Sequence, residues 1–417
     1  MPKLLFITYY FPPLRQVACL RTSNIVKHLK NQGWEVSVIT PSPALWNDDS
    51  KDEYDEKLSE MGIKFLYTQC RRKLLLPHGQ IQLGLFWTTF IGKKLKSLIR
   101  SIARAMRVDK MSGWYPEVKK AAIAIKPGDF DIVMASGNPY GAFQCAADIA
   151  HQIKCPVVFD YRDLWSGNPH MRASKKFRDF NTERKLLNKC DAVTVVSPSM
   201  KQSMEEMFGI KNKVHIIPNG YDIDEYAHIE ATEFDHIAIV YAGQFIAPNS
   251  TPEPIMKAMD LLNNDDTLPS WKFHYMGPSG KAVNDQIKQY GLENRYTYHG
   301  NVPREKCLKN IKGASLAIII TSVNKEASLA EKGIITGKVF EPLALEIPIL
   351  AIAPEGSDVE RVIEGSGWMY SSNQVNEITK IMKSIIRQES KFEVRNELHN
   401  WCNISKRLSD HLNKLSH

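Results

Sequence analysis

Short apolar runs typical of buried strands alternate with segments of helical spacing along the whole chain. The first two runs, Lys3 to Tyr10 and Glu35 to Thr40, are separated by a helical segment that stops at Asn31-Gln32-Gly33. A strand, a helix and a second strand in this order form the building block of a parallel sheet. The pattern therefore predicts an α/β protein.

The alternation continues through both halves of the chain. Further strand-like runs are Asp131 to Ser136, Pro156 to Asp160, Ala192 to Ser197, Val214 to Pro218, Ile237 to Ala242, Trp271 to Met276, Tyr296 to Gly300, Ser315 to Ile320 and Pro348 to Ala353. A chain of 417 residues is long enough to build two domains with cores of their own. We therefore expect two doubly wound domains.

Composition narrows the class of protein. No apolar run approaches the ~18 residues of a membrane-spanning helix. The N-terminus enters a strand-like run without the features of a signal peptide, so we expect a cytoplasmic protein. The seven cysteines are scattered and lack any Cys-x-x-Cys spacing, which indicates reduced thiols and no metal site.

Positive charge is concentrated in one segment. The net charge is +8, and residues 61–108 hold ten Lys or Arg and no Asp or Glu. Within this segment, Phe86 to Arg107 has the spacing of a basic amphipathic helix. It could be a domain helix whose basic side faces water, a membrane-surface helix or a nucleic-acid patch. The lack of acidic residues favours an anionic membrane surface, and no recognisable nucleic-acid-binding module is present.

The segment Gly337 to Leu350 has the features of a nucleotide-sugar site. Lys338 and Glu341 are three residues apart and would share one face at a helix N-terminus, where backbone N–H groups and the dipole favour an anion. Lys338 could meet a phosphate while Glu341 accepts hydrogen bonds from a ribose. A solvated surface pair is the alternative.

This segment resembles the donor site of the retaining glycosyltransferases of family 4. In those enzymes the matching Glu holds the nucleotide ribose and the Lys contacts the diphosphate. A second Glu that is common eight positions earlier corresponds to Gly333 here. The turn at Gly243 and Gln244 also resembles the family's Gly-rich turn, although relatives commonly have Arg in place of Gln244.

The loop after Gly243 contains no cation between Ile246 and Thr251. Diphosphate binding is therefore expected to depend on Lys338 and backbone amides, together with Arg304 from the loop after Gly300.

Two further loops resemble the acceptor side of the family. Residues 160–165, Asp-Tyr-Arg-Asp-Leu-Trp, match the Asp-x-Arg-Asp-x-Trp signature of one branch. Asp160, Arg162 and Asp163 could hold acceptor hydroxyls or help to move a proton, with Asp163 the better candidate because it lies further into the loop. The alternative is an internal Arg–Asp pair that fixes the loop.

The opening loop contains an aromatic-Pro-Pro turn like that of the family, followed by a helix with an early Arg, Arg21. It lacks the Gly pair of many relatives. Pro13 and Arg15 in this loop, and Asn138 after a later strand, are expected near the acceptor.

The resemblance covers nearly the whole chain and implies the GT-B fold, with two Rossmann-like doubly wound domains whose parallel sheets face a cleft. The Pro-Asn-Gly turn at 218–220 resembles the interdomain crossover of the family. We expect an acceptor-binding domain at 1–222, a nucleotide-sugar-binding domain at 223–390 and a C-terminal helix at 391–417 that packs toward the first domain.

The implied activity is transfer of a hexosyl or N-acetylhexosaminyl group from a nucleotide sugar to a saccharide or lipid-linked saccharide, with retention of configuration and without a metal or cofactor. Such an enzyme would serve cell-surface polysaccharide synthesis, peripheral on the inner face of the cell membrane. Two other functions stay open. An epimerase of the same fold would convert the donor without an acceptor, and a non-catalytic membrane-surface scaffold would bind it without turnover.

Overall fold

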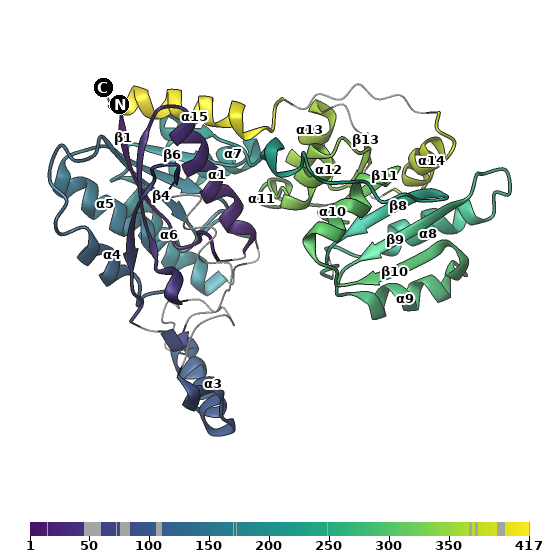
Figure 1. Ribbon diagram of the computed structural model, residues 1–417, viewed down its shortest axis with the longest axis horizontal. Helices are drawn as coiled ribbons and strands as arrows, with labels where there is room; N and C mark the ends of the chain where they lie inside the picture. The colour runs from purple at the N-terminus through teal and green to yellow at the C-terminus, as the bar shows by residue number, and fades with distance from the viewer. Residues whose placement is uncertain are drawn as a thin grey trace. The chain divides into compact units, whose positions relative to one another are not determined.

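The computed structural model describes residues 1–417 except 15, 46–59, 72, 76–83, 106–110, 170, 172, 248, 325, 367–368, 372–373, 390–396 and 417. The chain forms two compact units (Figure 1). The first comprises Met1–Val196, Met204–Pro218 and Ile404–His417, and the second comprises Ser197–Ser203 and Asn219–Asn403.

The first unit is built on a seven-stranded parallel sheet of order β3-β2-β1-β4-β5-β6-β7. Its strands are β1 (Lys3–Ile7), β2 (Glu35–Pro41), β3 (Lys64–Thr68), β4 (Ile132–Gly137), β5 (Val157–Tyr161), β6 (Ala192–Val195) and β7 (Val214–Ile216). Leu4 of β1 lies opposite Val36 on one side and Ile132 on the other. Buried side chains from Leu4 to Ile7 show that this strand is covered on both faces, as expected for the centre of a parallel sheet.

Helices connect these strands. Their bounds are α1 (Val17–Asn31), α3 (Phe90–Ala105), α4 (Tyr115–Ala121), α5 (Gly141–Ile153), α6 (Ala173–Leu187) and α7 (Pro198–Phe208), with short 3-10 turns η1 (Pro43–Leu45), η2 (Lys73–Leu75), η3 (Leu85–Thr88) and η4 (Lys211–Lys213). α1 stops at the predicted place because Gly33 takes a φ of +87°, which favours glycine.

The second unit has a six-stranded parallel sheet of order β10-β9-β8-β11-β12-β13. Its strands are β8 (Ile237–Ala242), β9 (Trp271–Met276), β10 (Tyr296–Gly300), β11 (Leu316–Ile320), β12 (Ile349–Ile352) and β13 (Met369–Ser371). Numbered along this unit the order is 3-2-1-4-5-6, which is that of the Rossmann fold.

Helices cover both faces of the second sheet. Their bounds are α8 (Glu253–Asn263), α9 (Gly280–Gln289), α10 (Arg304–Lys312), α11 (Leu329–Lys332), α12 (Phe340–Ala344), α13 (Asp358–Gly365) and α14 (Val375–Ile386), with 3-10 turns η5 (Ile223–Glu225), η6 (Glu293–Arg295) and η7 (Gly337–Val339).

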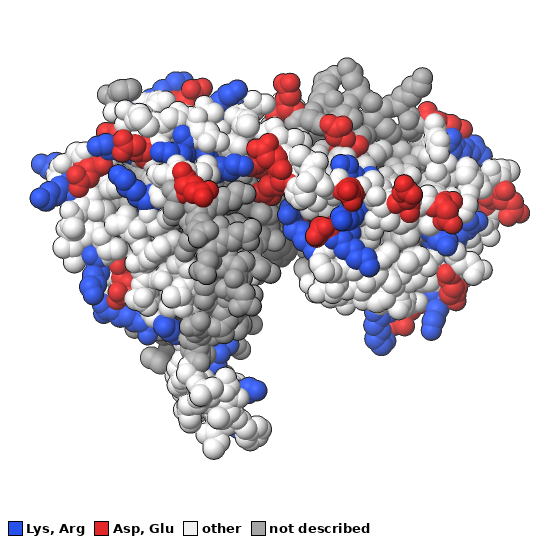
Figure 2. Space-filling model, viewed as in Figure 1, with Lys and Arg blue, Asp and Glu red and all other residues white. Residues whose placement is uncertain are grey.

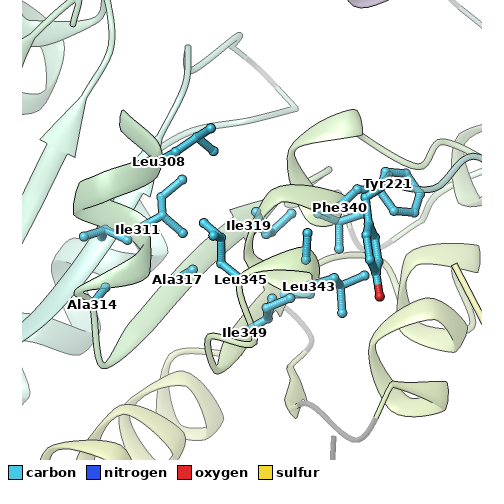
Figure 3. Packing of buried hydrophobic residues seen from close by; sticks show 14 of the residues in the cluster. Tyr221, Leu308, Ile311, Ala314, Ala317, Ile319, Phe340, Leu343, Leu345 and Ile349 are labelled. Carbon is cyan, nitrogen blue, oxygen red and sulfur yellow. The ribbon is translucent and has the colours of Figure 1, made fainter. Parts of the chain in front are cut away.

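Alternate residues of each strand supply the two cores of this unit. Val240 of β8 packs with Leu308 of α10 and Leu343 of α12 (Figure 3 shows the last two). The neighbouring residue Ile239 packs in the opposite core with Met256 of α8. The period of two along a strand thus places the helix that carries Glu341 against the sheet.

The C-terminal helix α15 (Trp401–Ser416) begins in the second unit and continues in the first. In the second unit, Trp401 N–H donates to the Tyr221 carbonyl at 3.0 Å. In the first unit, the indole N–H of Trp34 donates to Ser409 Oγ at 2.9 Å, and both residues are buried. These contacts fix the helix at its start and in its second half.

The doubly wound α/β fold with two Rossmann-like units confirms the fold class predicted from the sequence. Most strands lie within the predicted runs, but β3 was not predicted. Its side chains are mostly half-exposed, because β3 is an edge strand that pairs with β2 alone. Among the described helices, none is both long and apolar enough to cross a membrane.

Candidate active site

Gly243 follows β8 and lies directly beside Lys338. Its φ is +145°, and a Cβ built on it would lie 2.0 Å from Lys338 Nζ. The Gly243 N–H donates to the Met276 carbonyl at 2.8 Å, and the Tyr275 hydroxyl donates to the Gly243 carbonyl at 3.0 Å. A side chain at 243 would therefore displace the ammonium group of Lys338, which explains why this position is Gly.

Lys338 extends from η7, at the start of the segment that continues into α12. Thr336 Oγ1 accepts a hydrogen bond from the Lys338 N–H at 3.4 Å and caps this turn. The side chain is half-buried, with Nζ 5.6 Å from the centroid of the Tyr241 ring. Burial lowers the pKa of Lys338, whereas the nearby Glu341 charge opposes this shift.

Glu341 lies one turn after Lys338 and pairs with Arg304. Arg304 Nε donates to Glu341 Oε1 at 3.3 Å, and Arg304 Nη2 donates to the Tyr226 hydroxyl at 3.1 Å. Glu225 lies 3.9 Å from the same guanidinium. Burial raises the pKa of Glu341, and the Arg304 charge acts against this rise. Arg304 is thus held by two carboxylates and a tyrosine.

The structure brings together four residues that the sequence analysis took from three separate segments. Gly243, Arg304, Lys338 and Glu341 all belong to loops or helix starts at the carboxyl end of the second sheet, where ligands bind in parallel α/β folds. Within the described part of the chain, Lys338 has no carboxylate at salt-bridge distance. Its ammonium donors are therefore available to a ligand.

Gln244 lies beside this cluster with an exposed side chain, and its carbonyl accepts a hydrogen bond from the Tyr241 hydroxyl at 3.3 Å. The turn after β9 supports it from below. Ser279 N–H donates to the Tyr275 hydroxyl at 2.8 Å, and Ser279 Oγ accepts from the Phe245 N–H at 3.2 Å. These bonds fasten the turns after β8 and β9 to each other.

Sequence reasoning missed Tyr226, Glu225 and Ser279 at this site. The only signal for Ser279 was its place in a Gly-Pro-Ser-Gly run directly after a strand. Nothing in the sequence marked Tyr226 or Glu225, because they reach Arg304 from a segment almost eighty residues away.

Gly333 occupies the position of the second Glu of the family and has little room for a side chain. A Cβ there would lie 3.3 Å from Ser199 Cβ. Its carbonyl accepts a hydrogen bond from Ser197 Oγ at 3.1 Å. A Glu at 333 would require this neighbouring backbone to shift by a few tenths of an ångström, so the Gly is consistent with its packing.

Asp160, at the end of β5, is fully buried and paired with Arg21 of α1. The guanidinium donates through Nη2 to Oδ1 at 2.6 Å and through Nε to Oδ2 at 3.1 Å. Thr194 and Ser136 hydroxyls donate to the same carboxylate at 2.7 and 2.8 Å. Burial alone would raise the pKa of Asp160, but the Arg21 charge and these hydrogen bonds bring it below its usual value. This carboxylate supports the loop that follows it.

Arg162 and Asp163 follow β5 and lie nearer the surface. Arg162 donates to the carbonyls of Gly137 at 2.9 Å and Asn138 at 2.8 Å, and its guanidinium lies 5.1 Å from the centroid of the Tyr10 ring. It thereby joins the loops after β1, β4 and β5, which are neighbouring strands. The Asp163 side chain is exposed.

The other acceptor-side candidates differ in accessibility. Asn138 is exposed, whereas Pro13 is buried in the opening loop. Arg15 lies outside the described residues. Trp165, two residues after Asp163, stacks on Tyr140 with ring centroids 4.8 Å apart. The Tyr140 hydroxyl donates to the Asp163 carbonyl at 2.9 Å and fixes its backbone.

Glu183 of α6 holds the far end of the same loop from below. It is fully buried, and its Oε2 accepts hydrogen bonds from the Ser166 N–H at 2.9 Å and the Ser166 hydroxyl at 2.5 Å. Burial raises the pKa of Glu183 to about 7, although the Ser166 bonds oppose the rise.

This raised pKa predicts a pH-dependent stability. Glu183 holds a proton in the folded state but loses it in the unfolded chain above pH ~4.5, so its contribution is full below that pH and is lost as pH rises through about 7. Relative to Glu183→Gln, the wild type should lose on the order of 2 kcal/mol of unfolding free energy between about pH 5 and pH 7.5. Urea unfolding across this range measures it, with Glu60→Gln, an exposed position, as control. Parallel profiles for the wild type and Glu183→Gln would contradict the assignment.

Two family models match the chain in succession. Residues 21–225 match the model described as Glycosyltransferase Family 4, and residues 222–401 match the model described as Glycosyl transferases group 1. No curated protein sequence matches this chain.

Solved structures of low sequence identity share the fold over the full length. HepE of Anabaena in a complex with UDP and glucose has 15% identity and a TM-score of 0.60, with 100% of both chains covered. Sucrose-phosphate synthase of Thermosynechococcus elongatus has 14% identity and a TM-score of 0.60, covering 100% of this chain and 99% of that one. The lipopolysaccharide outer core galactosyltransferase WaaB has 11% identity and a TM-score of 0.58, with 99% of each chain covered.

The fold is therefore GT-B. With glycosyltransferase models matching both halves, the protein is a glycosyltransferase of the GT-B type.

Proposed function

We propose that this protein is a retaining, metal-independent glycosyltransferase of family 4 that transfers a hexosyl or N-acetylhexosaminyl group from a nucleotide sugar to a saccharide or lipid-linked saccharide. Cell-surface polysaccharide synthesis is the process that such a product would serve. The observation that carries the proposal is the cluster of Lys338, Glu341 and Arg304 beside Gly243.

The cluster suits the charge that develops during sugar transfer. As the glycosidic bond breaks, negative charge grows on the leaving diphosphate, and a fixed ammonium in a half-buried site stabilises it without reorganisation. Lys338 has this place, next to backbone that carries no side chain at Gly243. Glu341 is positioned one turn away to accept hydrogen bonds from the ribose hydroxyls.

Arg304 has a positioning role in this proposal. It is bound to Glu341, Tyr226 and Glu225, so it fixes the orientation of the Glu341 carboxylate that is to meet the ribose. The diphosphate contact then falls mainly to Lys338 and to backbone amides of the turn at Gly243 and Gln244.

The first unit would bind the acceptor. Asp163 and Asn138 are exposed at the ends of neighbouring strands, and Arg162 holds their loops together. These side chains can orient an acceptor hydroxyl by hydrogen bonds. Retention follows if the departing phosphate takes the proton of that hydroxyl on the face from which it leaves.

A thermal-shift screen against UDP-, GDP-, TDP- and CMP-sugars and their free nucleotides tests the donor site. UDP compounds come first, because HepE was solved with UDP and with UDP-glucose. A ligand that binds only the folded state adds about 2.7 kcal/mol at one hundred times its Kd. We expect one nucleotide class to raise the Tm, and no shift with any of them would contradict the proposal.

Turnover then separates the three functions. With the stabilising donor and a saccharide acceptor, release of nucleoside diphosphate and an unchanged anomeric configuration by NMR support retaining transfer. Conversion of the donor without any acceptor would instead identify an epimerase. Donor binding without turnover under every acceptor condition would favour a non-catalytic scaffold.

A further inference from the structure

Helix α3 presents its apolar side to solvent. The stripe formed by Ile91, Leu95, Leu98 and Ile102 spans about 60° of the helix. Their exposed fractions are 69%, 39%, 55% and 51%. A helix that packs on its own domain buries such a stripe, so this orientation is the reverse of the domain-helix interpretation, in which the basic side faces water.

Part of the basic side faces the protein instead. Arg100 donates through Nε to the Leu74 carbonyl of η2 at 2.8 Å, and Arg100 and Lys96 are partly covered. α3 packs against η2 and η3 and extends away from the sheet of its unit (Figure 1). Lys93 and Lys94 are exposed, and Lys94 Nζ lies 4.6 Å from the centroid of the Phe90 ring.

The turn η3 adds aromatic surface to the same element. Leu85, Phe86 and Phe90 are 86%, 52% and 72% exposed. η3 folds closely onto the start of α3, because a Cβ on Gly92 would lie 2.0 Å from the Phe86 carbonyl oxygen. We call this set the η3–α3 apolar surface: Leu85, Phe86, Phe90, Ile91, Leu95, Leu98 and Ile102. Figure 2 shows α3 as mainly uncharged atoms with cations at its edge.

We propose that the η3–α3 apolar surface inserts into the interface of an anionic phospholipid bilayer. Large apolar and aromatic side chains next to exposed lysines are the composition of helices that lie in the headgroup region. The ten Lys or Arg residues of 61–108 and the lack of any acid there complement anionic lipid.

The same charges disfavour the other occupants. A second copy of this chain would bring an equally cationic segment against the first, and like charges at close distance repel. Nucleic acid would use the cations but would leave the apolar side chains in water. A bilayer satisfies both sets of groups. The docking is independent of the donor site, whereas its use to reach a lipid-linked acceptor rests on the proposed function.

Sedimentation of the full chain with vesicles, without donor or acceptor, tests this proposal. Vesicles of phosphatidylcholine alone are compared with vesicles that also contain phosphatidylglycerol. We expect the wild type to bind the anionic vesicles at least about tenfold more tightly, with weaker binding at high salt. Equal binding to both vesicles, or to neither, would overturn the proposal.

Two variants separate apolar from electrostatic contributions. Ile91→Glu combined with Leu98→Glu should abolish sedimentation with either vesicle. Lys93→Gln combined with Lys94→Gln should remove roughly tenfold of the binding to anionic vesicles only. Phe177→Glu is the matched control, because Phe177 is 77% exposed on α6 of the same unit. It should bind as the wild type does.

Further readouts guard against misinterpretation. The Tm of each variant checks that it folds, since exposed positions should leave the Tm unchanged. Unaltered vesicle binding by the Ile91→Glu, Leu98→Glu protein would refute the apolar insertion. A dimer in light scattering that this variant dissociates, with no vesicle binding by the wild type, would assign the surface to a second copy instead. A donor-induced Tm shift in the same variant reports on the proposed function separately.

Discussion

Replacing Arg21 with Met is expected to lower the free energy of unfolding by about 3–5 kcal/mol, because it leaves the buried Asp160 carboxylate without its charge partner. Asp160 is fully buried and receives two hydrogen bonds from the Arg21 guanidinium. Arg21 also donates to the carbonyls of Ile217 and Pro218, at 3.0 and 3.1 Å. The substitution therefore disturbs both the end of β5 and the segment after β7.

Urea unfolding followed by circular dichroism measures this loss. The double variant Arg21→Met, Asp160→Asn removes both charges and should recover part of the stability, because no unpaired charge is then buried. Lys281→Met is the control, since Lys281 pairs with Asp285 at the surface with 91% of its side chain exposed. A loss of less than about 1 kcal/mol in Arg21→Met would contradict the buried ion pair.

Replacing Lys338 with Met is expected to weaken nucleotide binding by about 100-fold, which corresponds to ~2.7 kcal/mol and to the loss of charge-assisted hydrogen bonds to a diphosphate. Without ligand, the variant should be as stable as the wild type or slightly more stable. Met keeps the apolar stem beside Gly243, and burial already disfavours the charged form of Lys338.

Calorimetry with the nucleotide that stabilises the wild type measures the affinity, and urea unfolding without ligand measures the stability. Lys281→Met serves again as the control, because it removes a cation from the same unit at a fully accessible position. Unchanged affinity in Lys338→Met would remove Lys338 from the donor site. A large loss of stability without ligand would mean that its role is structural.

The assignment of the candidate catalytic residues stays a prediction. Its alternatives for the loop at 160–165 do acquire a physical basis. Asp160 is enclosed by Arg21, Thr194 and Ser136, which favours the internal ion pair for that carboxylate, with Arg21 as the partner. Asp163 is exposed and remains the candidate for contact with an acceptor.

Local pattern determined the element order and the fold class. Apolar runs such as Ile237 to Ala242 are confirmed as strands because a parallel strand buried on both faces must be apolar throughout. The edge strand β3, from Lys64 to Thr68, escaped this rule since it is only partly buried. Short motifs also marked Lys338, Glu341, Gly243 and Arg304 individually.

Tertiary structure decided which of these residues meet and which side of an amphipathic helix is covered. Tyr226 and Glu225 reach Arg304 from a distant segment, and no periodicity records such a long-range pairing. Helical spacing in α3 separates an apolar from a basic side but carries no information about which one packs on the protein. Only the contact of Arg100 with Leu74 and the exposure of Ile91 answer that question.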